Sequence, residues 1–443
     1  MVTRTKGYGF VILLSVCVLV PSMVDAVPAA SRQTGQSCSA CHIGSFGPQL
    51  NSFGREFKLN GYTTGGVQSA LKNFSAMLVA GFEHTDKDLP PDSTDKKAND
   101  NLTVDQVSVF YAGALATHLG IFAQATYDGV ADAYSWDNVD IRYANTTRIA
   151  GKDLIYGVTI NNNPSSQDLW QTAPAWMFPY VASGIAPTPD AGPFMASLGQ
   201  TVGGVGVYSM WNNLLYTELS GYATLWDRVQ QDLGVADVFS SDHLQGVAPY
   251  WRLSLQHEFG HHYVSLGAFG MYARRYPGND RTAGSDSFLD DAIDATYQYS
   301  AGNHAVSLSA TALNERQILD ASLALGTYSN QRDTLNCFNL NASYYYKNTY
   351  GITLGRFISQ GSSDETLFPD ADNHRPDSGG TTVQIDVTPF GKNESPGGTY
   401  LNVRFLVQYV AYDKFNGLGK NYDGTGRNAS DNNTLYLGTW LSF

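Results

Sequence analysis

Phe74-Ser75-Ala76-Met77-Leu78-Val79-Ala80-Gly81-Phe82-Glu83 alternates between two rows of side chains. The even row is Phe, Ala and Leu, whereas the odd row is mixed and ends in Glu83. Successive side chains of a β-strand point to opposite faces. The stretch therefore predicts a strand with its even row in lipid and its odd row, which includes Met77, in a lumen.

Similar segments of roughly ten residues follow along the chain. Short turns and long connections rich in Asp, Asn, Gly, Pro and Ser separate them alternately, as in outer-membrane barrels. We count about fourteen to sixteen segments and favour sixteen, because an even number puts both ends of the barrel on one side. The prediction is an all-β, antiparallel transmembrane barrel over residues 72–443. The later segments are 102–115, 139–149, 154–161, 205–211, 214–225, 250–259, 262–273, 292–300, 304–313, 335–346, 350–359, 381–390, 401–412 and 434–443.

Composition and the two ends of the chain favour the same location. Charged residues are only 15% of the chain and aromatic residues reach 12%, while the net charge of −13 disfavours nucleic acid as a partner. Residues 1–26 have the basic start, short apolar run and small-residue cleavage site of a signal peptide. The ending Leu435–Phe443 resembles the C-terminal assembly signal of bacterial outer-membrane proteins. We expect an outer-membrane protein with both termini on the periplasmic side.

Cys38-Ser39-Ala40-Cys41-His42 is a C-x-x-C-H box, the attachment site of a c-type haem. The two thiols form thioethers with the porphyrin, and His42 then lies under the iron as its proximal ligand. The alternatives are a disulfide, a redox pair or half of a zinc site with His42 incidental. Cys337 is left without a partner, and we interpret it as a small apolar residue in a strand.

Residues 27–71 precede the barrel and contain one expected helix, which begins at Pro48 and ends at Asn60-Gly61. Its Leu50, Phe53 and Phe57 would pack on the porphyrin. So short a segment cannot build its own core, whereas a barrel of sixteen strands has an open channel. We therefore predict a haem-bearing plug in the lumen. The apolar connection 162–203 is expected to fold over or into the mouth of the barrel.

The segment around the haem box resembles the fused monohaem cytochrome-porins of iron-oxidising bacteria. The similarity covers about residues 30–63 and rests on Ala30-Ser31-Arg32-Gln33-Thr34-Gly35, Pro48-Gln49-Leu50, Phe53-Gly54-Arg55-Glu56-Phe57-Lys58 and Gly61-Tyr62-Thr63. It implies one covalent haem c, oxidation of extracellular Fe(II) and transfer of electrons to a periplasmic c-type cytochrome or similar carrier. In that family the proline lies nearer the haem histidine, whereas residues 43–47 intervene here, which indicates a side branch of the family.

Other residues are candidates for the rest of the site. Met77 is the candidate distal ligand, since methionine raises the potential of a haem. His84, His118, His261 and His262 are weaker candidates, and an open position is also possible. Arg55 could pair with a propionate or face solvent. The acidic residues of three long loops could gather Fe(II), or simply be solvated: Asp86, Asp88, Asp92, Asp95; Asp286, Asp290, Asp291; Asp364, Glu365, Asp370, Asp372.

His257-Glu258-Phe259-Gly260-His261 matches the H-E-x-x-H signature of zinc proteases, which requires a helix. Strand alternation precedes it and Gly260 interrupts it, so we predict a strand running into a turn and no metalloprotease. Two classes of function remain: an electron-transfer protein with Fe(II) oxidase activity, and a diffusion porin in which haem plugs or gates the lumen. Electron flow to or from a different extracellular partner would use the same architecture.

Overall fold

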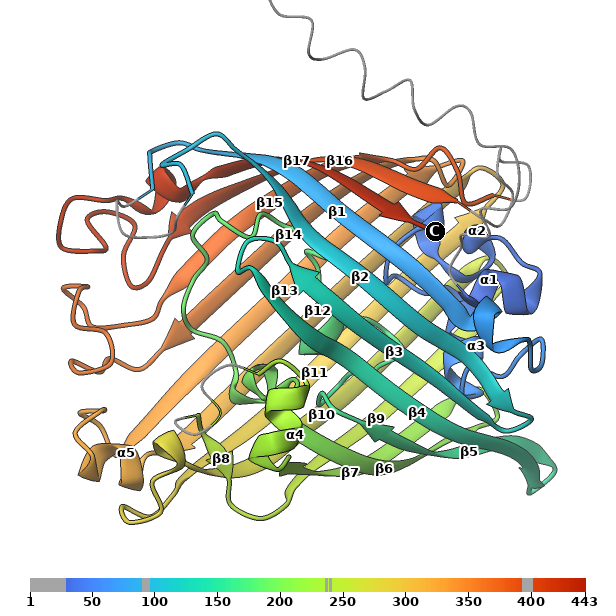
Figure 1. Cartoon of the computed structure of the whole chain (residues 1–443), viewed down its shortest axis with the longest axis horizontal. Helices are drawn as coiled ribbons and strands as arrows, with labels where there is room; N and C mark the ends of the chain where they lie inside the picture. Colours follow the sequence, from blue (N-terminus) through green and yellow to red (C-terminus); the bar gives the residue numbers. More distant parts are fainter. Residues whose placement is uncertain (1–28, 90–95, 236–237, 239–240, 393–400) are drawn as a thin grey trace, which may run out of the picture.

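Sixteen long antiparallel strands close into one barrel in the computed structural model (Figure 1). The structure describes residues 29–89, 96–235, 238, 241–392 and 401–443, so the predicted signal peptide lies outside the described residues. β1 pairs with both β2 and β17, which completes the ring. A seventeenth strand, β8, has two residues; it lies in the connection between β7 and β9 and pairs with β10.

The strands are β1 (Phe74–Thr85), β2 (Asn101–Ala116), β3 (Leu119–Asp128), β4 (Ala133–Ile149), β5 (Lys152–Asn161), β6 (Val202–Trp211), β7 (Leu215–Thr224), β8 (His243–Leu244), β9 (Ala248–Phe259), β10 (His262–Tyr276), β11 (Asp286–Ala301), β12 (His304–Ile318), β13 (Arg332–Tyr346), β14 (Tyr350–Gly361), β15 (Ser378–Val387), β16 (Asn402–Lys414) and β17 (Thr434–Ser442). The α-helices are α1 (Ala29–Thr34), α2 (Cys38–Cys41), α3 (Ser52–Leu59), α4 (Asp227–Asp232) and α5 (Asp320–Ala324). None of these described helices is long and apolar enough to cross a bilayer.

The predicted alternation between the two walls is confirmed. On β1 the odd row, including Met77, Val79 and Glu83, is buried on the inner wall. Large apolar side chains such as Leu102, Leu266 and Ile293 are exposed on the outer wall. A soluble protein rarely exposes so much apolar surface, and a lipid-facing barrel requires it.

The prediction from sequence was wrong at three places. β3 was not among the predicted segments, because its alternation is weak and only four residues separate it from β4. β11 begins at Asp286, so Asp286, Asp290 and Asp291 belong to a strand and not to a loop. α3 begins at Ser52, not at Pro48, because the Asn51 side chain accepts a hydrogen bond from the Gly54 N–H and caps the helix.

Short turns join the strands at one end of the barrel, which we call the turn end, and most long connections lie at the opposite, loop end. Helices α1 to α3 lie at the turn end, where the C-terminus also lies (Figure 1). Residues 29–73, the N-terminal segment, contact the inner wall around its circumference. Its wall partners include Ala114 of β2, Asp140 and Arg142 of β4, Tyr208 of β6, Gln298 of β11, Ala305 of β12, Tyr345 of β13 and Asn402 and Arg404 of β16.

Residues 162–201, which join β5 to β6, also fold into the lumen, and we call them the inward loop. Leu169, Trp170 and Met195 are buried there. The loop meets the N-terminal segment directly, since the Leu50 N–H donates to Gln171 Oε1 at 3.0 Å and Lys58 Nζ donates to the carbonyls of Ser166 and Asp168 at 2.7 Å. Its wall partners run from Glu218 of β7 through Thr311 of β12 and Asn339 of β13 to Gln408 of β16.

Candidate functional site

A cavity of about 700 Å³ lies inside the barrel, where the N-terminal segment, the inward loop and strands β1 to β4, β16 and β17 meet. Cys38, Cys41 and His42 line it, and so does Met77 from β1. The volume falls within the roughly 300–1,000 Å³ of typical small-molecule and cofactor sites. The predicted attachment residues, the proximal ligand and the candidate distal ligand therefore share one space.

The backbone around His42 is fixed on both sides. α2 is a single turn, so Cys38 and Cys41 lie on the same side of it. After His42 the chain reverses, and His42 and Leu50 form an antiparallel bridge. The Ile43 N–H donates to the Gln49 carbonyl at 3.0 Å and the Asn51 N–H donates to the Cys41 carbonyl at 2.9 Å. This short ladder holds the haem box against the start of α3.

The electrostatic surroundings favour neutral side chains. Burial, together with the positive charge of Arg404, lowers the pKa of the His42 imidazole to about 4. Burial raises the pKa of the Cys38 thiol, and burial with the proximity of Cys38 raises the pKa of the Cys41 thiol to about 12. Near neutral pH His42 is thus in its uncharged form, which is the form that binds a metal.

Several buried polar atoms on the cavity lining make no hydrogen bond. They are Nδ1 of His42, Oδ1 of Asn402 and Nε1 of Trp440. Buried polar atoms normally have a partner, so these three are available to a bound group or to water. Leu50, Phe57 and Trp176 add apolar lining. Two thiols, an imidazole, a thioether and an apolar wall fit a c-type haem, which Cys38 and Cys41 would hold covalently and His42 would ligate.

The inward loop adds a residue that sequence reasoning missed. Met177 lines the same cavity as Met77, so two thioethers are available as distal ligands. Nothing in the sequence around Met177 distinguishes it from an ordinary loop methionine. The four candidate histidines do not line the cavity: His84 pairs with Asp100 at 2.8 Å, while His118, His261 and His262 lie in or beside turns.

Arg55 has a role that neither prediction described. It is buried, and it donates to the Leu50 carbonyl at 2.8 Å and to Gln298 of β11 at 2.9 Å. Its guanidinium lies 3.6 Å from the centre of the Tyr263 ring. Arg55 therefore fastens α3 to the wall. Phe53, expected to pack on the porphyrin, is 37% exposed and lies outside the cavity lining.

The acidic residues mostly organise the protein itself. Asp286 accepts hydrogen bonds from the N–H groups of Ala321 and Ser322, and Asp364 accepts them from Ser329 and Asn330. Asp92 and Asp95 lie outside the described residues. Within the described part of the chain, no group of three or more His, Cys, Asp or Glu side chains is placed to hold a metal ion.

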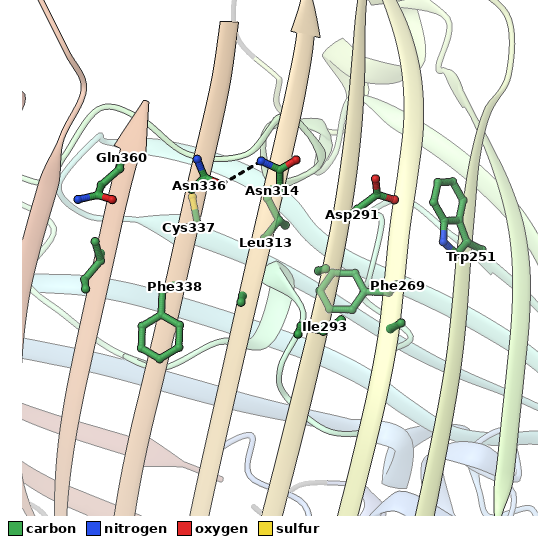
Figure 2. Close-up of a pocket in the computed structure, with 14 residues that line it drawn as sticks. Trp251, Phe269, Asp291, Ile293, Leu313, Asn314, Asn336, Cys337, Phe338 and Gln360 are labelled. Carbon is green, nitrogen blue, oxygen red and sulfur yellow. Dashed lines mark hydrogen bonds between the residues drawn. The ribbon is translucent and has the colours of Figure 1, made fainter. Parts of the chain in front are cut away.

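The H-E-x-x-H match lies where we predicted, on a strand and its turn. His257 is in β9, whereas Gly260 and His261 form the connection to β10. Cys337 is partly buried in β13, and its Sγ lies 3.7 Å from Ser359 Oγ. It lines a second hollow, of about 610 Å³, which a row of polar side chains borders: Asp291, Asn314, Asn336 and Gln360 (Figure 2). This hollow contains none of the haem-box residues.

No family model and no curated protein matches the chain. Solved porin structures are similar to it in fold at low identity. They include Salmonella typhi OmpF in complex with daunomycin (14% identity, 84% of this chain and 97% of that chain, TM-score 0.47) and an anion-selective porin from Comamonas acidovorans (11%, 84% and 98%, 0.46). The outer membrane channel DcaP of Acinetobacter baumannii is a third (12%, 84% and 96%, 0.43).

Proposed function

We propose that this chain is an outer-membrane electron-transfer protein with one covalent haem c. In this function it oxidises extracellular Fe(II) and passes electrons to a periplasmic c-type cytochrome or a similar carrier. The observation that carries the proposal is the shared cavity of Cys38, Cys41, His42 and Met77 inside a lumen that two chain segments occupy. An electron conduit requires an occupied lumen, whereas a diffusion pore requires a path.

The residues of the chain would divide the work as follows. Cys38 and Cys41 anchor the porphyrin, and neutral His42 binds the iron from one side. A haem in the lumen shortens the distance across a hydrocarbon layer of about 30 Å. Each Fe(II) ion gives up one electron and becomes Fe(III) outside the cell. A bound haem would supply the one-electron redox centre between this donor and the periplasmic carrier, so iron need not enter the cell.

The direct test is anaerobic addition of Fe(II) to the oxidised protein in detergent or liposomes. We expect reduced-haem absorption to appear promptly in the wild-type protein. The His42→Ala variant, which keeps both cysteines, is the matched control and should be reduced much more slowly. A wild-type protein that carries haem yet is not reduced by Fe(II) would contradict the proposed donor.

A second function has support from the other wall of the cavity. Gln106, Gln124 and Asp137 give the β2–β4 side a polar lining, which would suit a small polar solute. In this case the protein is a haem-plugged or haem-gated diffusion porin. Liposomes that contain the protein would then release a trapped sugar while Fe(II) fails to reduce the haem. A third possible function is electron delivery to an extracellular acceptor. A low midpoint potential of the haem would support this function.

A further inference from the structure

Residues 43–47, which separate His42 from Pro48, form a buried loop against the barrel wall. We call it the 43–47 loop. Ile43, Ser45 and Phe46 are all at most 6% exposed. Gly44 lies against the Tyr345 ring of β13, so closely that any side chain there would clash with the ring. Gly44 and Gly47 both have positive φ values, of 72° and 78°, which glycine adopts readily.

Two side chains of β16 hold this loop by its backbone. Asn402 Nδ2 donates to the Ser45 carbonyl at 2.6 Å, and Arg404 Nη2 donates to the Phe46 carbonyl at 2.8 Å. The Arg404 guanidinium also lies 5.3 Å from the centre of the Phe46 ring, and that ring packs edge-on against Trp440 of β17 at 4.9 Å. Arg404 and Asn402 are each 2% exposed, so bulk water does not compete for these contacts.

The loop ends beside the haem ligand. The Ser45 N–H donates to the His42 carbonyl at 3.4 Å, and the Ile43 N–H donates to the Gln49 carbonyl at 3.0 Å. The chain then reverses, and the His42–Leu50 bridge brings Gln49 back beside the His42 backbone. Histidines that bind metals almost always donate their second ring N–H to a carbonyl, a carboxylate or water, and that partner sets the orientation of the ring. Nδ1 of His42 is buried and has no hydrogen-bond partner among the described residues, so the orientation of the ring depends on the backbone that carries it.

We propose that Arg404 and Asn402 are positioning residues for the haem ligand. They act through the 43–47 loop, which follows directly on His42 and sets the course of the backbone that carries its ring. This inference rests on the proposed haem and deepens the account of its site. The fixed positive charge of Arg404, which lies against Gly47, would also favour the reduced, less positive iron of a bound haem.

Asp386 is the charge partner of Arg404, and removing one charge or the other should shift the midpoint potential in opposite directions. Asp386 of β15 has its Oδ2 3.6 Å from Arg404 Nε, and that oxygen accepts no hydrogen bond from the described part of the chain. Removing the charge of Arg404 should lower the midpoint potential, whereas removing the charge of Asp386 should raise it. Loss of packing alone would not give opposite signs at two adjacent residues.

The experiment measures haem content and midpoint potential in the full-length protein with Arg404→Gln, Arg404→Lys, Asp386→Asn or Asn402→Leu. We expect full haem content in each, because Cys38 and Cys41 are unchanged. Arg404→Gln should decrease the reduced-to-oxidised ratio at a fixed ambient potential by about tenfold, which is a shift of 59 mV, and Arg404→Lys should restore part of it. Asn402→Leu keeps the net charge, and we expect it to alter the electron paramagnetic resonance signal, which reports the orientation of the ligand ring.

The control is Arg356→Gln, which removes an arginine paired with Asp413 on the outer wall and should change neither readout. If Arg404→Gln does not assemble, Gly47→Ala tests the loop instead. The new Cβ would lie 3.1 Å from Arg404 Nη1 at a residue with a positive φ. We therefore expect Gly47→Ala to alter the electron paramagnetic resonance signal, as Asn402→Leu does. Potentials and spectra equal to wild type in all haem-loaded variants would overturn the inference and leave the proposed function standing. A wild-type protein without haem would overturn the proposed function itself.

Discussion

Two methionines line the cavity, and they come from different elements. Met77 lies on β1, where its strand partners are Ser442 and Ser108, whereas Met177 lies on the inward loop. A rigid strand holds a ligand more precisely than a loop does, so we expect Met77 to bind the iron. Met77→Ala should then change the spectrum of the oxidised haem and lower its potential, and Met177→Ala should leave both unchanged. Optical spectra and redox titration of the two variants measure this.

The reverse pattern would assign the distal position to Met177. If both single variants keep the wild-type spectrum, neither methionine is the ligand. The double variant Met77→Ala/Met177→Ala controls for the case in which Met177 binds the iron once Met77 is absent. It should show the same spectrum as Met77→Ala alone.

At the residue scale, the sequence could predict what local spacing determines. The C-x-x-C-H box and the inward row of β1 single out Cys38, Cys41, His42 and Met77 as candidates without any tertiary information, and these four residues line one cavity. Arg404 and Asn402 could not be predicted, because more than 350 residues separate them from the loop they hold. The sequence left two roles for Arg55, pairing with a propionate or facing solvent. Only the folded barrel shows that Arg55 donates a hydrogen bond to Gln298 of the wall.

At the scale of elements, α3 is attached to the inward loop through Lys58. Burial and the charge of Arg142 lower the pKa of Lys58 to about 7, although its ammonium is near the Trp176 ring and two carbonyls. The ordinary value is 10.5. Between these two pH values the unfolded chain keeps the proton and the folded chain releases it. The free energy of unfolding should therefore rise with pH from about 7 to 10.5.

Lys58→Met tests this dependence, because it removes the titrating group and keeps an apolar side chain. Urea unfolding in micelles at several pH values should show a smaller increase over that window for the variant than for wild type. Lys152→Met, at an exposed position on β5, is the matched control. Parallel curves for wild type and Lys58→Met would exclude Lys58 as the source.

A second attachment is the buried pair of Arg142 and Asp140 on β4. Arg142 Nε lies 2.8 Å from Asp140 Oδ2, and the same guanidinium donates to the carbonyls of Lys58 and Gln167. Arg142→Met leaves Asp140 buried without its cation, which costs about 3–5 kcal/mol of unfolding free energy. Arg148→Met, on the same strand but in an exposed pair with Asp153, should show no measurable change. Equal stability of both variants would contradict this role for Arg142.

The elements themselves were predictable where periodicity is strong. Segment 304–313 predicts β12 because apolar and polar side chains alternate strictly from Val306 to Ala312. β3 is different: Ala123 and Gln124 are both buried, and a register shift between Ala123 and Ala125 interrupts its pairing with β4. The sequence predicts that the inward loop folds toward the barrel, because its Trp and Phe side chains avoid water. It does not specify which wall residues these side chains contact.

At the scale of the whole molecule, the barrel combines a wide ring of strands with a lumen that two chain segments occupy in part. Sixteen strands alone would leave an aqueous channel, but the N-terminal segment and the inward loop meet each other and contact the inner wall between β2 and β16. The pairing of β1 with β2 and β17 does not involve either segment. The barrel should therefore close without them.

Single-channel conductance in planar bilayers tests this division. We expect the full-length protein to conduct poorly and a variant that lacks both residues 30–71 and residues 164–199 to conduct several-fold better, because water and ions then fill the space. Variants with one deletion should fall between the two, since the remaining segment still obstructs the path. Heat-modifiable migration in gels confirms that each variant has a closed barrel. Full-length protein that conducts as well as the double deletion would show an open path beside the cavity, and would favour the diffusion porin over the electron conduit.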